Sequence, residues 1–154
     1  LNENLLKSST VRDFMKDAVR VNELRSIGNY SHTCDRFFGE RWLLSGDAAM
    51  FLDPIFSSGV HMSLSSSKFA AETILKAWAD KRSLAEPDLG IAYEASVRKG
   101  AKRFHNLISL FYQGNFVEQM KKTLTRENMR KGFTSAVAGD MWNEDNFLFS
   151  KGVL

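Results

Sequence analysis

The sequence predicts a mainly α-helical chain with a few short strands, on the basis of three observations. Apolar residues recur at helical spacing over about 58–81 and again between Pro87 and Gly114. A short apolar run at 42–44 is typical of a strand that is buried on both faces of a parallel sheet. Between that run and the first long helix lies an irregular segment, 46–59, which fits neither period.

The first 45 residues are predicted to hold one helix and one strand. Hydroxyl groups from Ser8 onward can cap a helix over about 9–19, and its apolar spacing extends upstream to Leu5 and Leu6. We expect an extended segment over 20–30, a loop over 29–39, and then the strand over 41–45.

The two long helices carry the predicted core. In the helix over 58–81 the candidate buried residues are Met62, Phe69, Ile74 and Trp78. Proline fits the first turn of the next helix, because its missing N–H costs nothing there. The apolar stripe of that helix consists of Tyr93, Val97, Ala101, Phe104, Ile108 and Phe111. We expect Gly114 to end it and a third helix to follow over 116–131.

Composition excludes several classes of protein. The chain has 154 residues and 44% hydrophobic residues, which suits one globular domain, although it begins at Leu1 inside an amphipathic segment and so resembles part of something longer. The single Cys34, which we interpret as a small packed residue or free thiol, excludes an internal disulfide. A net charge of +3 is too small for a dedicated nucleic-acid domain, and the sequence shows no membrane span or signal peptide. We therefore expect a cytoplasmic protein.

Basic residues cluster at 98–103 and 121–131. We expect solvated helix faces there, with a docking site for an acidic partner as the alternative. His61 is expected to be a packed helix residue rather than a base. His32 and His105 have no neighbours at metal-ligand spacing, so we expect no metal site.

The irregular segment carries the chemistry. The strand ends at Gly46, where a missing Cβ lets a ligand come close, and Asp47 follows at the edge where open α/β sheets bind ligands. The next helix starts after Ser57, Ser58 and Gly59, and its unpaired N–H groups can hold an anionic group. A plain strand-to-helix turn, with the serines as helix caps, is the structural alternative.

The stretch from Gly46 to His61, GDAAMFLDPIFSSGVH, resembles the second FAD-binding motif of flavin-dependent monooxygenases. Its Gly-Asp-Ala start is similar to that of the whole para-hydroxybenzoate hydroxylase-like superfamily and of geranylgeranyl-reductase-like enzymes. The continuation from Asp53 resembles the flavin-dependent halogenase branch. Tyr30-Ser31, Phe111-Tyr112 and the segment 138–142 also look like parts of that family.

The resemblance implies roles for individual residues. The cofactor-binding residues would be Gly46, Asp47, Pro54, Ser57, Ser58 and Gly59. Asp47 would bind the ribityl chain of FAD and Pro54 would lie beside the flavin ring. The amides of Ser57, Ser58 and Gly59 would face the flavin, and those of Ser58 and Gly59 would also face a chloride or bromide ion. The reaction implied is halogenation of an aromatic substrate with reduced flavin, oxygen and halide, the cofactor supplying the chemistry.

The chain also departs from the halogenase pattern. It contains no G-x-G-x-x-G fingerprint, no Trp-x-Trp-x-Ile-Pro motif and no lysine in the context of the halogenating lysine. The sequence therefore predicts the C-terminal fragment of an α/β FAD-binding fold, without catalytic residues and inactive alone. Residues 1–60 would end the FAD-binding domain, and 61–154 would form a helical region.

The resemblance implies partners as well. These are an aromatic small molecule, possible tethering of it to a carrier protein, a separate flavin reductase, and a second copy of the chain at an exposed helix or strand surface. The alternative functions are an FAD-dependent hydroxylase or geranylgeranyl-reductase-like enzyme, and a non-catalytic helical interaction module.

Overall fold

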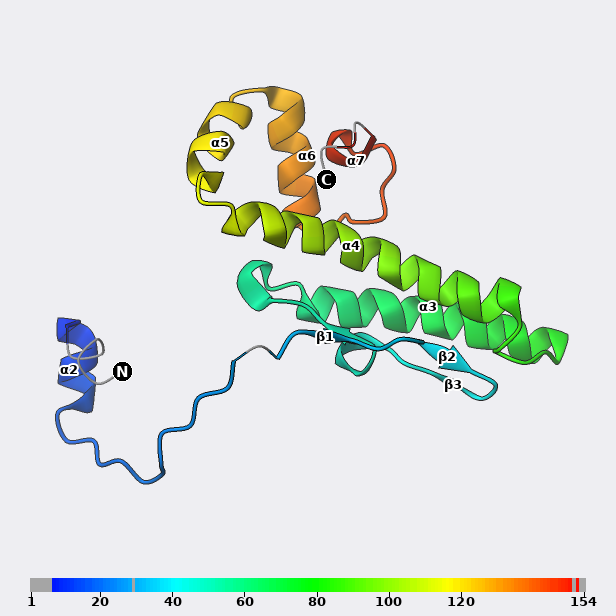
Figure 1. Cartoon of the computed structure of the whole chain (residues 1–154), viewed down its shortest axis with the longest axis horizontal. Helices are drawn as coiled ribbons and strands as arrows, with labels where there is room; N and C mark the ends of the chain where they lie inside the picture. The colour runs from blue at the N-terminus through cyan, green and yellow to red at the C-terminus, as the bar shows by residue number, and fades with distance from the viewer. Residues whose placement is uncertain (1–6, 29, 151, 153–154) are drawn as a thin grey trace.

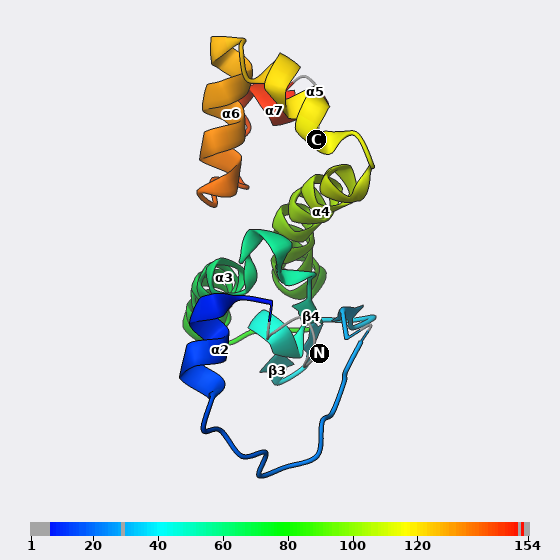
Figure 2. The ribbon, with the colours of Figure 1, turned by 90° about the vertical axis from the view of Figure 1, so that its left-hand side faces the viewer.

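Two long antiparallel helices, α3 (Gly59–Asp80) and α4 (Ala92–Tyr112), form the centre of the molecule (Figure 1). The computed structural model describes residues 7–28, 30–150 and 152. Short strands lie on one side of the helix pair, and three short helices gather at the end of α4. The N-terminal arm runs away from this body (Figures 1 and 2). The structure is thus mainly helical with a few short strands, as predicted.

Within the described residues, four two-residue strands form two separate antiparallel pairs. In the first pair His32 of β1 (His32–Thr33) lies opposite Phe51 of β4 (Met50–Phe51). In the second pair Phe38 of β2 (Phe38–Gly39) lies opposite Leu43 of β3 (Trp42–Leu43). The other described elements are all helical. They are α2 (Ser9–Met15), the short 3₁₀ helices η1 (Gly46–Ala48) and η2 (Pro54–Phe56), the short π-helix η3 (Pro87–Ile91), α5 (Phe116–Thr123), α6 (Glu127–Val137) and α7 (Phe147–Ser150).

The strand predicted over 41–45 is shorter than expected and is not part of a parallel sheet. It forms a tight hairpin with β2, and the side chain of Trp42 is 46% exposed. Antiparallel strands can pair across a two-residue loop, and here Glu40 and Arg41 are that loop. The loop predicted over 29–39 is also wrong, because β1 and β2 both lie within it.

In the part of the N-terminal arm that the structure describes there is one short helix, α2 (Ser9–Met15), and none of its residues is buried. α2 ends at Met15 rather than near Val19, and Phe14 is 85% exposed. Because α2 buries no residue, packing does not stabilise further helical turns beyond Met15. The described residues of 20–30 form no helix or strand, in keeping with an irregular extended segment. Leu5 and Leu6 lie outside the described residues.

The core lies between α3 and α4, and the two helices contribute differently. Five of the six predicted stripe residues of α4 are buried, and Phe111 is partly buried. On α3 the buried residues are small or flexible: Met62, Ser66, Ala70 and Ala77. The expectation that Ile74 and Trp78 are buried is wrong, since they are 42% and 79% exposed. Helical spacing alone did not distinguish the large-residue face of α3 from the small-residue face that meets α4.

The C-terminal region is divided more finely than predicted. The helix expected over 116–131 is two helices, α5 and α6, because the chain turns at 124–126. There the Thr125 hydroxyl donates to the Lys122 carbonyl (2.7 Å), a local bond that competes with continued helix. Met141, Leu148 and Phe149 are buried and attach this region to the core.

Arg98 and Arg103 do not belong to a freely solvated face, in contrast to the expectation for 98–103. Arg103 donates to the Met141 carbonyl (2.7 Å) and lies over the Phe149 ring, 4.1 Å from its centre. Its partly buried side chain thereby holds the C-terminal segment to α4. Lys99 and Lys102 are exposed.

Arg98 and Glu94 clamp the segment between β1 and β2 onto α4. Glu94 accepts hydrogen bonds from the Phe37 amide (3.0 Å) and from Arg98 (2.7 Å). The guanidinium of Arg98 donates to the carbonyls of Cys34 (2.8 Å) and Asp35 (3.0 Å). Among the described helices, none is long and apolar enough to cross a membrane.

The Glu94 clamp predicts a pH dependence of stability. Burial opposes ionisation of Glu94, but the Phe37 amide and Arg98 together lower its pKa below the ordinary value of 4.5. The ionised clamp therefore adds stability above pH 4.5, and this contribution is lost as the pH falls through the lowered pKa. Chemical denaturation of the Glu94→Gln variant should show lower stability at neutral pH and a weaker loss on acidification. Glu127→Gln, at an exposed ion pair, is the control; equal acid sensitivity of Glu94→Gln and the parent chain would contradict the clamp.

Candidate functional site

The turn at Gly46 is pressed against the first half of α3. Gly46 has a positive φ of 57°, and a Cβ placed on it would lie 2.6 Å from the Ser63 hydroxyl oxygen. Its amide donates to the Ser66 hydroxyl oxygen (2.9 Å). Both the conformation and the close approach favour glycine at this position.

The residues before the turn are held from two helices. The hydroxyl of Tyr93 on α4 donates to the Leu44 carbonyl (2.6 Å). The Ser45 hydroxyl lies 2.9 Å from that of Ser66 on α3. The chain therefore enters the turn along a path that side chains of α3 and α4 fix.

The turn is also held from the other side, through its carbonyl groups. The Nε2 atom of His32 lies 3.0 Å from the Asp47 carbonyl oxygen, and the Cys34 thiol lies 3.4 Å from the Ala48 carbonyl oxygen. The Cys34 amide donates to the Ala49 carbonyl (2.9 Å). The carboxylate of Asp47 is exposed and has no hydrogen-bond partner among the described residues. An oxygen of Asp47 is thus available to a ligand hydroxyl.

A second turn, 53–57, follows after β4. Asp53 accepts hydrogen bonds from the Ile55 amide and from the Tyr112 hydroxyl, each at 3.0 Å. The hydrogen bond to Asp53 raises the pKa of Tyr112. Pro54 is exposed, and Ser57 adopts the left-handed conformation with φ of 53°. One carboxylate therefore ties this turn both to itself and to the end of α4.

The start of α3 lies directly after this turn. Ser58 is 3% exposed and occupies the N-cap position, but its hydroxyl makes no capping bond. Gly59 is exposed, and a Cβ on it would meet no described atom within 4 Å. Ser58 therefore occupies the N-cap position expected in the structural alternative, but without the side-chain hydrogen bond of a typical cap. The first turn of a 22-residue helix is left uncapped, and its positive end favours an anionic group.

The predicted site residues thus fall in two clusters. Gly46 and Asp47 are in η1, which packs on α3, and Pro54 to Gly59 form η2 and the start of α3. Strand β4 joins the two clusters. An exposed carboxylate, an exposed proline and uncapped helix amides fit the hydroxyl groups and the anionic part of a flavin.

Several residues that shape this site have no local signal in the sequence. His32 and Asp47 are 15 residues apart, and Tyr112 and Asp53 are 59 apart. The serine-rich run at 63–67 is the one visible hint of close packing on α3. For Tyr112 the sequence offers only the resemblance of the Phe111-Tyr112 pair to the halogenase family.

His61 is packed, as predicted. Its ring centre lies 6.0 Å from that of Phe104 and 5.6 Å from that of Trp142, and Gly139 lies against it. Within the described ranges, no three His, Cys, Asp or Glu side chains are placed to hold a metal ion.

Curated relatives of the chain are flavin-dependent halogenases. It is 34% identical over 107 residues to a 1H-pyrrole-2-carbonyl-[peptidyl-carrier protein] chlorinase of Pseudomonas fluorescens, which covers 70% of this chain and 23% of the chlorinase. It is 37% identical over 70 residues to the corresponding brominase of Pseudoalteromonas luteoviolacea, covering 46% of this chain and 17% of the brominase. The chain thus spans less than a quarter of the length of these relatives. No protein-family model matches it.

Solved structures show the same likeness in three dimensions. The flavin-dependent brominase Bmp2 superposes with a TM-score of 0.71 at 25% identity, over 95% of this chain and 36% of that one. A flavoprotein/dehydrogenase from Cytophaga hutchinsonii has the same TM-score at 20% identity and covers 97% of this chain and 36% of its own, a likeness of fold alone.

The Gly46 turn predicts a specific pattern of mutational effects. Gly46→Ala should lower the free energy of unfolding by about 1–3 kcal/mol, from its positive φ and its overlap with Ser63. Adding Ser63→Ala removes the overlapping oxygen and should restore part of the loss, but not the part due to φ. Gly59→Ala, where there is open space and no positive φ, is the matched control. Denaturant titration measures all four proteins; equal losses for Gly46→Ala and Gly59→Ala would show that the turn is not constrained as described.

Proposed function

We propose that this chain, whose homologues are flavin-dependent halogenases, forms the C-terminal portion of an FAD-dependent halogenase. The enzyme would use reduced flavin, oxygen and halide to halogenate an aromatic substrate. The observation that carries the proposal is the fold of 46–61, where two anchored turns lead into an uncapped helix start. The identity to a chlorinase and a brominase favours halogenation over hydroxylation, reduction or a purely structural role.

Each site residue has a role in this proposal. Gly46 allows close approach and the free carboxylate of Asp47 accepts hydrogen bonds from the ribityl hydroxyls. Pro54 packs beside the flavin ring. The amides of Ser57, Ser58 and Gly59 face the flavin, and those of Ser58 and Gly59 also face a chloride or bromide ion at the positive end of α3. When bound, FAD supplies the redox chemistry.

The chain alone would lack part of this machinery. It has no G-x-G-x-x-G segment to bind the pyrophosphate of FAD. We assign no catalytic residue to it. In this proposal residues 1–60 end the FAD-binding domain and 61–154 form a helical region.

The names of the relatives suggest the substrate class. The chlorinase and the brominase both act on a pyrrole-2-carbonyl group on a peptidyl-carrier protein. We therefore propose an aromatic acyl substrate tethered to a carrier, with a separate reductase supplying reduced flavin in the cytoplasm. Exposed apolar residues on α3, among them Val60, Leu64, Leu75 and Trp78, offer a surface for association with a second copy.

Flavin binding by Asp47 can be tested in the gene product that contains this chain. Asp47→Ala should weaken FAD binding about tenfold or more, because a hydrogen-bonding charge is lost. Asp145→Ala, which removes an exposed carboxylate outside both clusters, should leave affinity unchanged. Fluorescence titration with FAD gives both values, and unchanged affinity in Asp47→Ala would exclude it as a ligand.

The reaction class needs a separate assay. With a flavin reductase, the same gene product and a pyrrole-2-carbonyl carrier protein should yield a carrier whose mass increases by one halogen in place of hydrogen. Chloride and bromide are supplied separately, and a reaction without halide is the control. A product that gains oxygen instead would identify a hydroxylase.

The chain by itself should bind FAD weakly. Titration of the 154-residue chain should give no saturable quenching of flavin fluorescence at micromolar concentrations, since the pyrophosphate-binding part is missing. Free tryptophan at equal absorbance controls for non-specific quenching. Stoichiometric binding would show that the site is complete without that part.

A further inference from the structure

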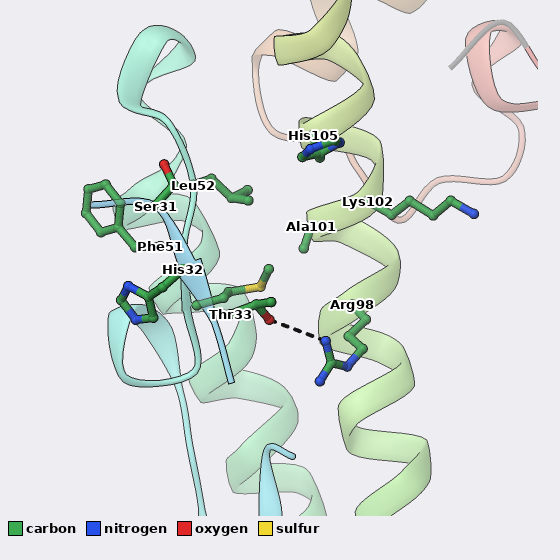
Figure 3. A pocket seen from close by; sticks show the side chains of 10 residues that line it. Ser31, His32, Thr33, Phe51, Leu52, Arg98, Ala101, Lys102 and His105 are labelled. Carbon is green, nitrogen blue, oxygen red and sulfur yellow. Dashed lines mark hydrogen bonds between the residues drawn. The ribbon is translucent and has the colours of Figure 1, made fainter. Parts of the chain in front are cut away.

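A cavity of about 500 Å³ lies between the β1–β4 pair and α4. One wall consists of residues 31–33 and 50–52, and the other of Arg98, Ala101, Lys102 and His105 on α4 (Figure 3). Its volume is in the range of small-molecule sites. None of the six residues proposed to bind flavin lines it.

The two walls are fixed relative to each other on both sides of the cavity. Arg98 donates to the Thr33 hydroxyl (3.3 Å) and to the Cys34 carbonyl (2.8 Å), joining α4 to β1. At the far end of α4, Tyr112 donates to Asp53, just beyond β4. The wall spacing is therefore set by hydrogen bonds, and a ligand would enter a preformed space.

The middle of the cavity is lined by apolar side chains. Met50 and Leu52 belong to the strand wall, and Ala101 lies on the side of α4 that faces the strands in Figure 3. Ala101 is 3% exposed, so it forms the floor of the cavity, and the longer side chains of Arg98 and His105 flank it one turn away on either side. This space suits a planar apolar group.

Hydrogen-bond donors lie at the ends of that apolar surface. Arg98 uses its guanidinium for Glu94, Thr33 and two carbonyls, which leaves an N–H of its Nη1 group without a described partner. His105 makes no hydrogen bond within the described part of the chain and lines the same wall one turn beyond Ala101. Arg98 and His105 are separated by about 10 Å along the helix. No acidic side chain is among the lining residues.

We propose that this cavity binds a planar aromatic carboxylate. The ring would lie over Ala101, between that residue and the apolar wall of Met50 and Leu52. The carboxylate would accept a hydrogen bond from the free N–H of Arg98. Glu94, which is bonded to Nε of the same guanidinium, does not line the cavity. The inference concerns a space outside the proposed flavin residues and does not depend on flavin binding.

The test is titration of the ¹⁵N-labelled 154-residue chain with 2-naphthoate, followed by NMR. Saturable shifts should concentrate at amides of 31–33, 50–52 and 98–105. Nuclear Overhauser contacts should join naphthoate protons to the Ala101 methyl. 2-Naphthamide, which keeps the rings but lacks the charge, should bind about tenfold more weakly.

Paired variants separate this cavity from general apolar binding. Ala101→Leu fills the space and should weaken 2-naphthoate binding tenfold or more, whereas Ala95→Leu, exposed on the same helix and outside the cavity lining, should not. If Ala101→Leu does not fold, the Overhauser contacts in the unmodified chain decide. The proposal is overturned by the absence of saturable shifts, by shifts centred on Val60, Leu64 and Trp78, or by equal affinity for the amide.

Discussion

The close contact between the backbone of Gly46 and the serine face of α3 is the constraint on which the rest of the site depends. The Ser66 hydroxyl accepts a hydrogen bond from the Gly46 amide and is within hydrogen-bond distance of the Ser45 hydroxyl. One buried side chain therefore bonds to two neighbouring residues of the turn. A larger side chain at Gly46 would separate the turn from the helix. The same small-residue face of α3 lets α4 approach, and α4 in turn provides Tyr93 and Tyr112.

Helices were more predictable than strands for a physical reason. The stripe of α4 is a local pattern, and five of its six residues are buried as expected. The pairing of Trp42 with Gly39 depends on a hairpin loop rather than on hydrophobicity, so an apolar run alone suggested the wrong kind of sheet. On α3 both faces carry apolar or small residues, and the spacing could not show that Ile74 and Trp78 are exposed. At the end of α5 the Thr125 hydroxyl bonds to the Lys122 carbonyl, a local contact that apolar spacing does not reveal.

The positions of the two turns were predictable from the sequence, whereas the side chains that hold the turns were not. The motif from Gly46 to His61 located the turns and the helix start from sequence alone, and the halogenase relatives agree with the resemblance that it carries. His32, Ser66 and Tyr112 act across separations of 15 to 59 residues and have no spacing signal. Which side chains bond to a loop depends on tertiary contacts, and the periodicity of the sequence does not encode these contacts.

Among the residues that the structure describes, the side chains that hold the Gly46 turn come from one stretch of the chain. His32, Cys34, Ser66 and Tyr93 hold it, and Tyr112 holds the turn that follows. The geometry of both turns is therefore encoded within residues 32–112. Recombination that moved this stretch as one block would carry the shape of the turns into a new protein, whereas a crossover between α3 and α4 would separate the Gly46 turn from Tyr93 and the 53–57 turn from Tyr112.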